Sequence, residues 1–211
     1  MYRLISATPS PYARKVRIAL TEKQLPFELV TEVPWHATTK TPQHNPLEKL
    51  PVLLLPDGGS VYESSFILQY LEWMHPDTPL LPDDLTGKIA ARRLEVLCDG
   101  VCDALVLTFF ERMRGEGRVS ASWLARQRRK VDGGLKEMAR LVGTGPFAVG
   151  GRFSLGDIAA GTVTGYLGVR FPEMDWRGQY PGLAALCTRL EQRPSFLASV
   201  PFPQKIMETI V

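Results

Sequence analysis

Residues that build disulfides and metal sites are scarce in this chain. Its 211 residues include three cysteines and three histidines, and the histidines lack the paired spacing of a zinc site. Cys98 and Cys102 lie close together on an expected helix while Cys187 is distant, which suits buried thiols better than a disulfide. We therefore expect neither a metal cofactor nor a disulfide framework.

A large excess of one charge is also missing. Lys and Arg total 25 against 22 Asp and Glu, and this formal charge of +3 is too balanced to indicate nucleic acid binding. No apolar stretch reaches the length of a membrane span, and the first residues carry no apolar signal-peptide core. We therefore expect a cytoplasmic protein without a membrane partner. With 45% hydrophobic residues, the composition is that of a folded globular protein.

The hydrophobic pattern changes near residue 76. Before that point, short β-rich runs alternate with helical patterns, which predicts a small α/β domain over residues 1–76. The expected strands are 2–6, 27–32, 52–55 and 60–62, and the expected helices are 11–23 and 64–75.

The remainder of the chain reads as helical. Residues 77–84 are rich in Pro and Asp and are expected to form a linker. Residues 85–211 show helical periodicity with little strand character, which predicts an all-α second domain. The expected helices of this domain are 90–113, 121–142, 155–168 and 182–192.

Ser10 follows the first expected strand and immediately precedes the first helix. This places it at the N-cap, with Pro11 at the first helical position, where a missing N–H costs nothing. The free N–H groups and the positive end of the helix dipole converge near the Ser10 hydroxyl, so a thiolate or carboxylate bound there would be stabilised. The same residues also suit an ordinary helix cap. No Gly-x-Ser-x-Gly elbow surrounds Ser10, so a serine hydrolase is not indicated.

Two further segments of the first domain carry polar chemistry. The Leu50–Pro51 bond opens a strand and is a candidate for the cis form, which would turn the Leu50 backbone outward to pair with an extended peptide ligand. Lys49 is placed to meet a ligand carboxylate, or is solvated like most exposed lysines. Glu63 and Ser64 start the second helix, where Ser64 would bind a carboxylate and Glu63 an amino group; helix capping is the alternative.

Ser10-Pro11, Leu50-Pro51 and Glu63-Ser64 occur in this order on a β-α-β…β-β-α pattern that a helical domain follows. Together they resemble the soluble glutathione transferases, and the resemblance covers nearly the whole chain. The Ser-Pro-x-x-Arg-Lys-Val-Arg-Ile form of this first motif is most similar to the serine-type classes and their small bacterial relatives. The resemblance implies a thioredoxin-like first domain that holds glutathione and a helical second domain that supplies the pocket for an electrophile.

The resemblance also implies roles for individual residues. Ser10 would donate a hydrogen bond to the glutathione thiolate, Glu63 and Ser64 would hold the γ-glutamyl end, the Leu50 backbone the cysteinyl part, and Lys49 the glycine carboxylate. Candidate walls of the electrophile pocket are Tyr12, Trp35, Phe109, Phe110 and Met113. Aromatic residues at helical spacing also suit a hydrophobic core.

Other residues limit these assignments. Ser6 and Thr8 lie close enough to compete with Ser10 for the thiol. No cysteine occupies this turn, which argues against thiol-transferase or dehydroascorbate-reducing chemistry, and the Ser-Ser-Cys run typical of zeta-class maleylacetoacetate isomerases is absent. In the second domain Ser154 and Asp157 are similar to the family's capping box, so we assign them to folding.

Two function classes follow from the resemblance. The first is an enzyme that uses glutathione as co-substrate to conjugate or isomerise small hydrophobic electrophiles, as in detoxification, and that forms the homodimer usual in the family. The second is a non-enzymatic relative that binds ligands or proteins through the same fold.

Overall fold

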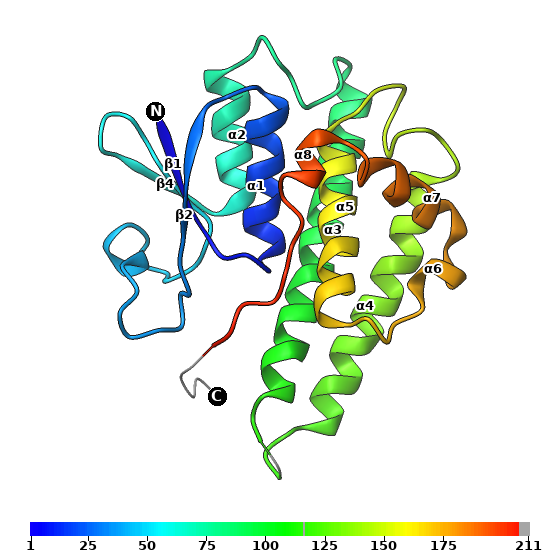
Figure 1. Cartoon of the computed structure of the whole chain (residues 1–211). Helices are drawn as coiled ribbons and strands as arrows, with labels where there is room; N and C mark the ends of the chain where they lie inside the picture. The colour runs from blue at the N-terminus through cyan, green and yellow to red at the C-terminus, as the bar shows by residue number, and fades with distance from the viewer. Residues whose placement is uncertain (116, 207–211) are drawn as a thin grey trace. The chain divides into compact units, whose positions relative to one another are not determined.

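The computed structural model describes residues 1–115 and 117–206 (Figure 1). By internal contacts the chain separates into two compact units, one formed by residues 1–80 with residues 192–206 and the other by residues 81–191. None of the helices in the described ranges is long and apolar enough to cross a membrane.

The first unit is built on a mixed four-stranded sheet in the order β2-β1-β3-β4. β1 pairs with β2 in parallel, and β3 runs antiparallel to both β1 and β4. The strands are β1 (Tyr2–Ser6), β2 (Phe27–Thr31), β3 (Val52–Leu54) and β4 (Ser60–Tyr62). Helices α1 (Pro11–Glu22) and α2 (Ser64–Met74) lie together on one face of this sheet (Figure 1). This is the α/β domain that the sequence pattern predicts and the thioredoxin-like arrangement that the resemblance implies.

Alternation along the strands separates the two faces of the sheet. Leu4 is fully buried on the helix-covered face, while Arg3 is exposed and Ile5 contributes to the opposite face. The buried apolar side chains of this unit, contributed by the sheet, α1 and α2, include Leu4, Val16, Leu20, Leu53, Ile67 and Leu71. The turn between β3 and β4 has Gly58 at φ +92°, a conformation that side-chain-bearing residues rarely adopt.

The second unit is helical within its described residues. Its helices are α3 (Leu85–Arg112), α4 (Ala121–Val142), α5 (Leu155–Arg170), α6 (Trp176–Gln179) and α7 (Pro181–Leu190). α3 packs against both α4 and α5, and α5 is buried over most of its length. The predicted capping box at the start of α5 is present, because Ser154 caps Gly156 N–H while the Asp157 carboxylate accepts from the Ser154 N–H at 2.8 Å.

The C-terminal residues that the structure describes return to the first unit. α8 (Pro194–Leu197) packs on α1, where the guanidinium of Arg193 donates to both oxygens of Glu22, at 3.0 and 2.8 Å, and the Ser195 hydroxyl donates to the same carboxylate. The sequence-based expectation puts residues 85–211 in a single domain. The contacts group residues 192–206 with the first unit because these polar side chains find their partners on α1.

Most predicted elements agree with the structure to within a few residues. The clearest difference in length is α3, which begins at Leu85 rather than near residue 90 because Asp84 caps Gly87 N–H at 2.8 Å. The sequence did not predict α6, α8 or the 3-10 turn η1 (Thr41–Gln43). These elements span about one turn each, which is too short for hydrophobic periodicity to be detected.

Candidate active site

Strand register gathers the predicted polar segments at one edge of the sheet. Ile5 in β1 pairs with Val52 in β3, and Val52 pairs with Tyr62 in β4. The chain therefore leaves β1 toward Ser10, enters β3 from Pro51 and leaves β4 toward Glu63, all at the same edge. Sheet topology thus brings together the three motifs that lie far apart in the sequence.

Ser10 caps α1 as expected. Its hydroxyl oxygen accepts a hydrogen bond from the Ala13 N–H at 3.2 Å, and Pro11 takes the first helical position. A serine hydroxyl carries one hydrogen and two lone pairs, so an oxygen that accepts from the helix keeps its own hydrogen available to a second group. Because Ser10 is only half-buried, this hydrogen can be donated to an anion bound at the helix N-terminus.

The two competing hydroxyls are less accessible. The Thr8 hydroxyl oxygen is buried and has no hydrogen-bond partner among the described residues, and Ser6 is buried as a whole. A buried oxygen does not reach a ligand without movement of its surroundings. The burial of the Thr8 hydroxyl oxygen and of Ser6 therefore favours Ser10 as the donor to a thiol.

The loop before β3 is held by a buried asparagine. The Asn45 side chain donates to the Lys49 carbonyl at 2.8 Å and accepts from the Leu47 N–H at 2.9 Å, while the Lys49 side chain is exposed. The Leu50–Pro51 peptide bond is cis, as the sequence suggested. The Leu50 backbone groups have no partner within the described part of the chain, which leaves them available to an extended ligand.

Glu63 occupies the N-cap of α2 in the left-handed region, at φ 70° and ψ 122°. Its carboxylate accepts from the N–H groups of Ser65 and Phe66, at 3.2 and 3.4 Å, and from the Ser65 hydroxyl. Burial raises the pKa of Glu63, but these hydrogen bonds and the charge of Lys15 outweigh burial, so the pKa lies below its ordinary value. The helix-capping alternative is therefore realised in this structure, with an ionised carboxylate.

Ser64 is buried and its hydroxyl donates to the Glu63 carboxylate at 3.3 Å. The same short segment thus combines a negative charge from Glu63 with a hydroxyl and the positive end of a helix dipole. Such a pairing matches a ligand that carries an amino group and a carboxylate on one carbon.

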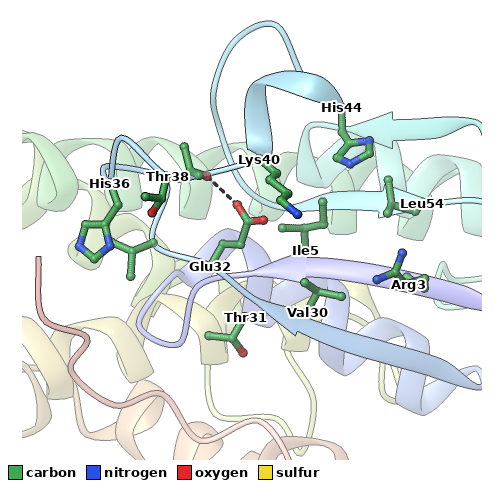
Figure 2. A pocket seen from close by; sticks show the side chains of 12 residues that line it. Arg3, Ile5, Val30, Thr31, Glu32, His36, Thr38, Lys40, His44 and Leu54 are labelled. Carbon is green, nitrogen blue, oxygen red and sulfur yellow. Dashed lines mark hydrogen bonds between the residues drawn. The ribbon is translucent and has the colours of Figure 1, made fainter.

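A cavity of about 600 Å³ lies on the other face of the sheet, beneath the connection between β2 and β3 (Figure 2). Ile5, Val30 and Leu54 form its apolar floor, and the loop carries Glu32, whose carboxylate accepts from the Thr39 hydroxyl at 2.6 Å. None of the residues predicted to bind glutathione lines it. This cavity is separate from the group of motifs at the sheet edge.

The predicted electrophile-pocket residues belong to both units. Tyr12 is half-buried and Trp35 is exposed in the first unit. In the second unit Phe109 and Phe110 pack edge to face with ring centroids 5.2 Å apart, and Met113 follows the end of α3. A smaller cavity of about 210 Å³ in this unit is lined by none of these residues. The pocket for an electrophile stays a prediction.

Two residues of the site were not predicted. Lys15 was overlooked because a lysine is normally exposed, yet it is buried on α1; its spacing of four residues before the buried Ala19 is a signal for that face. Asn45 was overlooked because its role depends on the local loop conformation. Among the described residues no cluster of His, Cys, Asp and Glu side chains is placed to hold a metal ion.

A thioredoxin-like sheet with two helix N-termini at one edge, in a chain with a helical second unit, defines the class of glutathione-binding transferase folds. Comparison with known proteins supports this class. The glutathione S-transferase N-terminal domain matches residues 9–73, and the glutathione S-transferase C-terminal domain matches residues 121–189. The chain belongs to the glutathione S-transferase family.

Solved structures and a curated relative give the same family. A glutathione S-transferase from Methylobacterium radiotolerans, in complex with glutathione sulfonate, is 72% identical with a TM-score of 0.98, covering 100% of this chain and 99% of that chain. A glutathione S-transferase from Methylobacillus flagellatus with glutathione bound is 41% identical with a TM-score of 0.91, covering 95% and 100%. The uncharacterized GST-like protein YibF of Escherichia coli K12 is 32% identical over 94% of this chain and 98% of its own length.

Proposed function

We propose that this protein is a glutathione transferase that ionises the thiol of glutathione for attack on small hydrophobic electrophiles. The observation that carries the proposal is the half-buried Ser10 at the N-cap of α1, whose oxygen accepts from Ala13 and whose hydrogen is available to an anion. The glutathione and glutathione sulfonate bound in the two similar bacterial structures support glutathione as the ligand.

A hydrogen bond from Ser10 is strong enough to increase the thiolate fraction of bound glutathione at neutral pH. A free thiol has a pKa of about 8.5, so only a few per cent is thiolate at neutral pH. A hydrogen bond to an ionised partner is worth roughly 1.5–3 kcal/mol, which lowers the thiol pKa by about one to two units before the helix dipole is counted. The thiol releases its proton to solvent, and the thiolate sulfur forms a bond to the electrophilic carbon. A leaving group departs with the electrons of its bond to that carbon, or the electrons of a double bond to that carbon take up a proton. Ser10 donates a hydrogen bond throughout and is not itself the nucleophile.

The other motifs hold the tripeptide. The γ-glutamyl end, with its amino group and carboxylate, lies against Glu63 and Ser64 at the start of α2. The Leu50 backbone beside Pro51 pairs with the cysteinyl part, and the exposed Lys49 meets the glycine carboxylate. These assignments are supported by the strand register, which brings the three segments to the same edge of the sheet.

Assembly as a homodimer is part of the proposal. α2 carries Phe66 and Trp73, 51% and 64% exposed, in edge-to-face contact with centroids 6.3 Å apart. Large apolar side chains grouped on one exposed helix face are typical of a protein interface. We also propose a cytoplasmic location and an electrophile pocket that includes Tyr12, Trp35, Phe109, Phe110 and Met113.

An ultraviolet difference titration with glutathione tests the proposal. The wild-type protein should give a saturable thiolate absorbance at neutral pH, and Ser10→Ala should raise the pKa of the bound thiol by about one to two units. Loss of the cap should cost folding stability only ~1 kcal/mol. Thr8→Val is the matched control, since it removes the buried hydroxyl nearby at nearly constant volume and should leave the thiol pKa unchanged.

The alternatives give different results. An unchanged thiol pKa in Ser10→Ala rejects the role of Ser10, and a raised pKa in Thr8→Val assigns that role to Thr8. Binding without a thiolate signal in the wild type indicates a ligand-binding relative. Absence of glutathione binding indicates a protein that uses the fold for interaction only.

A further inference from the structure

The cavity on the sheet face opposite α1 and α2 has no part in the proposed glutathione site (Figure 2). Its volume of about 600 Å³ is typical of small-molecule sites, which measure roughly 300–1,000 Å³. Such sites combine an apolar lining with a few polar groups that orient the ligand. The residues that line this cavity therefore indicate the kind of ligand it suits.

The floor of the cavity is apolar and belongs to three neighbouring strands. Ile5 in β1 pairs with Val30 in β2 and with Val52 in β3, and Leu54 lies two residues beyond Val52 on the same face. Ile5 is 2% exposed, and Val30 and Leu54 are half-buried. A flat hydrocarbon body placed between the strands and the loop would cover this apolar surface.

Two cations border the floor. The Lys40 side chain points from the loop toward the sheet (Figure 2), and it forms no ion pair or hydrogen bond with a residue that the structure describes. The Arg3 guanidinium donates through Nε to Glu28 at 2.9 Å, which leaves its other four N–H groups available. His36 and His44 also line the cavity, and each imidazole carries at least one N–H donor.

Glu32 is the acidic residue in the cavity wall, and its carboxylate is used by the loop itself. The Thr39 and Thr41 hydroxyls donate to it at 2.6 and 2.9 Å. Burial raises the pKa of Glu32, but these hydrogen bonds and those from the Lys40 and Thr41 backbone outweigh burial, so the pKa lies below its ordinary value. The ionised carboxylate therefore holds the loop, and the charged groups left for a ligand are the two cations.

We propose that this cavity is a second ligand site, which binds an organic anion with a flat apolar body and one carboxylate or sulfonate. The body lies on Ile5, Val30 and Leu54, and the anionic group meets the Lys40 ammonium. A neutral molecule of the same shape gains the apolar contact without the charge interaction. The inference does not rest on the proposed function, because none of the residues proposed to hold glutathione lines the cavity.

Titration of the full-length protein with 2-naphthoate, followed in methyl-labelled NMR spectra, tests the location. The methyl signals of Ile5, Val30 and Leu54 should shift and saturate. Leu4 and Leu29 are the internal control, since this pair adjoins Ile5 and Val30 in the register but is directed to the opposite face. Their signals should shift much less. Saturation without a shift of the floor signals would overturn the inference.

Calorimetric titration with 2-naphthoate and with the neutral 2-naphthylmethanol tests the role of charge. Wild type should bind the anion more tightly, and Lys40→Met should weaken anion binding roughly three- to tenfold without effect on the alcohol. Lys136→Met is the matched control, because it removes an exposed lysine outside the cavity and should change neither affinity. Equal binding of anion and alcohol by wild type, or an unchanged anion affinity in Lys40→Met, would contradict the proposal.

Glutathione separates this site from the proposed active site. The affinity for 2-naphthoate should be the same with and without saturating glutathione, and Lys40→Met should bind glutathione like wild type. Displacement of 2-naphthoate by glutathione would overturn the separation of the two sites. A protein that binds 2-naphthoate on this floor but binds no glutathione would support the inference and reject the proposed function, so the two failures are distinguishable.

Discussion

The ion pair between Glu22 on α1 and Arg193 before α8 should make a measurable contribution to stability. The pair is bidentate and partly buried, with 15% of the Glu22 side chain and 34% of the Arg193 side chain exposed. Breaking a fully buried pair costs about 3–5 kcal/mol and an exposed pair contributes about 0–1 kcal/mol. We therefore expect Arg193→Gln to lower the free energy of unfolding by ~2 kcal/mol, after allowance for solvent screening.

Urea and thermal unfolding provide the assay. A loss of ~2 kcal/mol corresponds to a decrease in Tm of about 4–8 °C for a chain of this size. Arg3→Gln is the control, because the Arg3–Glu28 pair has a similar distance of 2.9 Å but both side chains are 49% exposed. That control should change stability by less than about 0.5 kcal/mol. Equal effects of the two substitutions would refute the reasoning from burial.

The pH dependence of this pair supplies a second criterion. Burial raises the pKa of Glu22, but hydrogen bonds from Arg193 and Ser195 and the charge of Arg193 outweigh burial and lower the pKa overall. A depressed carboxylate pKa contributes stability that is present above the unfolded pKa of about 4.3 and is lost as the pH falls through the folded value. The stability difference between wild type and Arg193→Gln should therefore shrink below about pH 4. A constant difference down to acid unfolding would contradict this account.

Two further predictions concern the helical unit and are checked by urea unfolding. A Cβ at Gly134 would lie 2.2 Å from Cγ2 of Val101, so Gly134→Ala should cost ~1–3 kcal/mol. A Cβ at Gly133 meets nothing within 4 Å, so Gly133→Ala should instead stabilise α4 by up to ~1 kcal/mol. A change in the free energy of unfolding with the same sign in both variants would be inconsistent with this packing. Asp157→Ala removes the acceptor of two buried N–H groups and should cost ~2 kcal/mol or more, whereas Ser154→Ala should cost ~1 kcal/mol. An equal loss in these two variants would show that the carboxylate adds nothing to the cap.

The site motifs could be predicted because each depends on local rules. Ser10 before Pro11 is a helix start on sequence grounds alone, and the structure places the cap there. The Ser154–Asp157 box follows the same logic. The division into an α/β domain and a helical domain followed from hydrophobic periodicity, which is strong in the longer helices and in the short alternating strands, whereas the thioredoxin-like fold followed from the family resemblance.

Features that depend on tertiary contact escaped prediction. Lys15 is charged, and a charge on a helix is expected in solvent unless a partner from another element is known. The association of residues 192–206 with the first unit depends on side chains of α1 whose partners no local pattern identifies. The Glu63 conformation is likewise set by several contacts at once.

The packing of the C-terminal segment on α1 affects when the first unit can complete its folding during synthesis. Phe196 lies against the guanidinium of Arg14 at 5.2 Å, and the Arg17 guanidinium donates to the Ala198 carbonyl at 2.8 Å. During synthesis α1 is translated before the helical unit and these partners after it, so α1 lacks their contacts until helices α3 to α7 have been made. A premature stop after residue 191 would keep helices α3 to α7 of the second unit. It would still remove α8 and the residues beside it, which pack on α1 in the first unit.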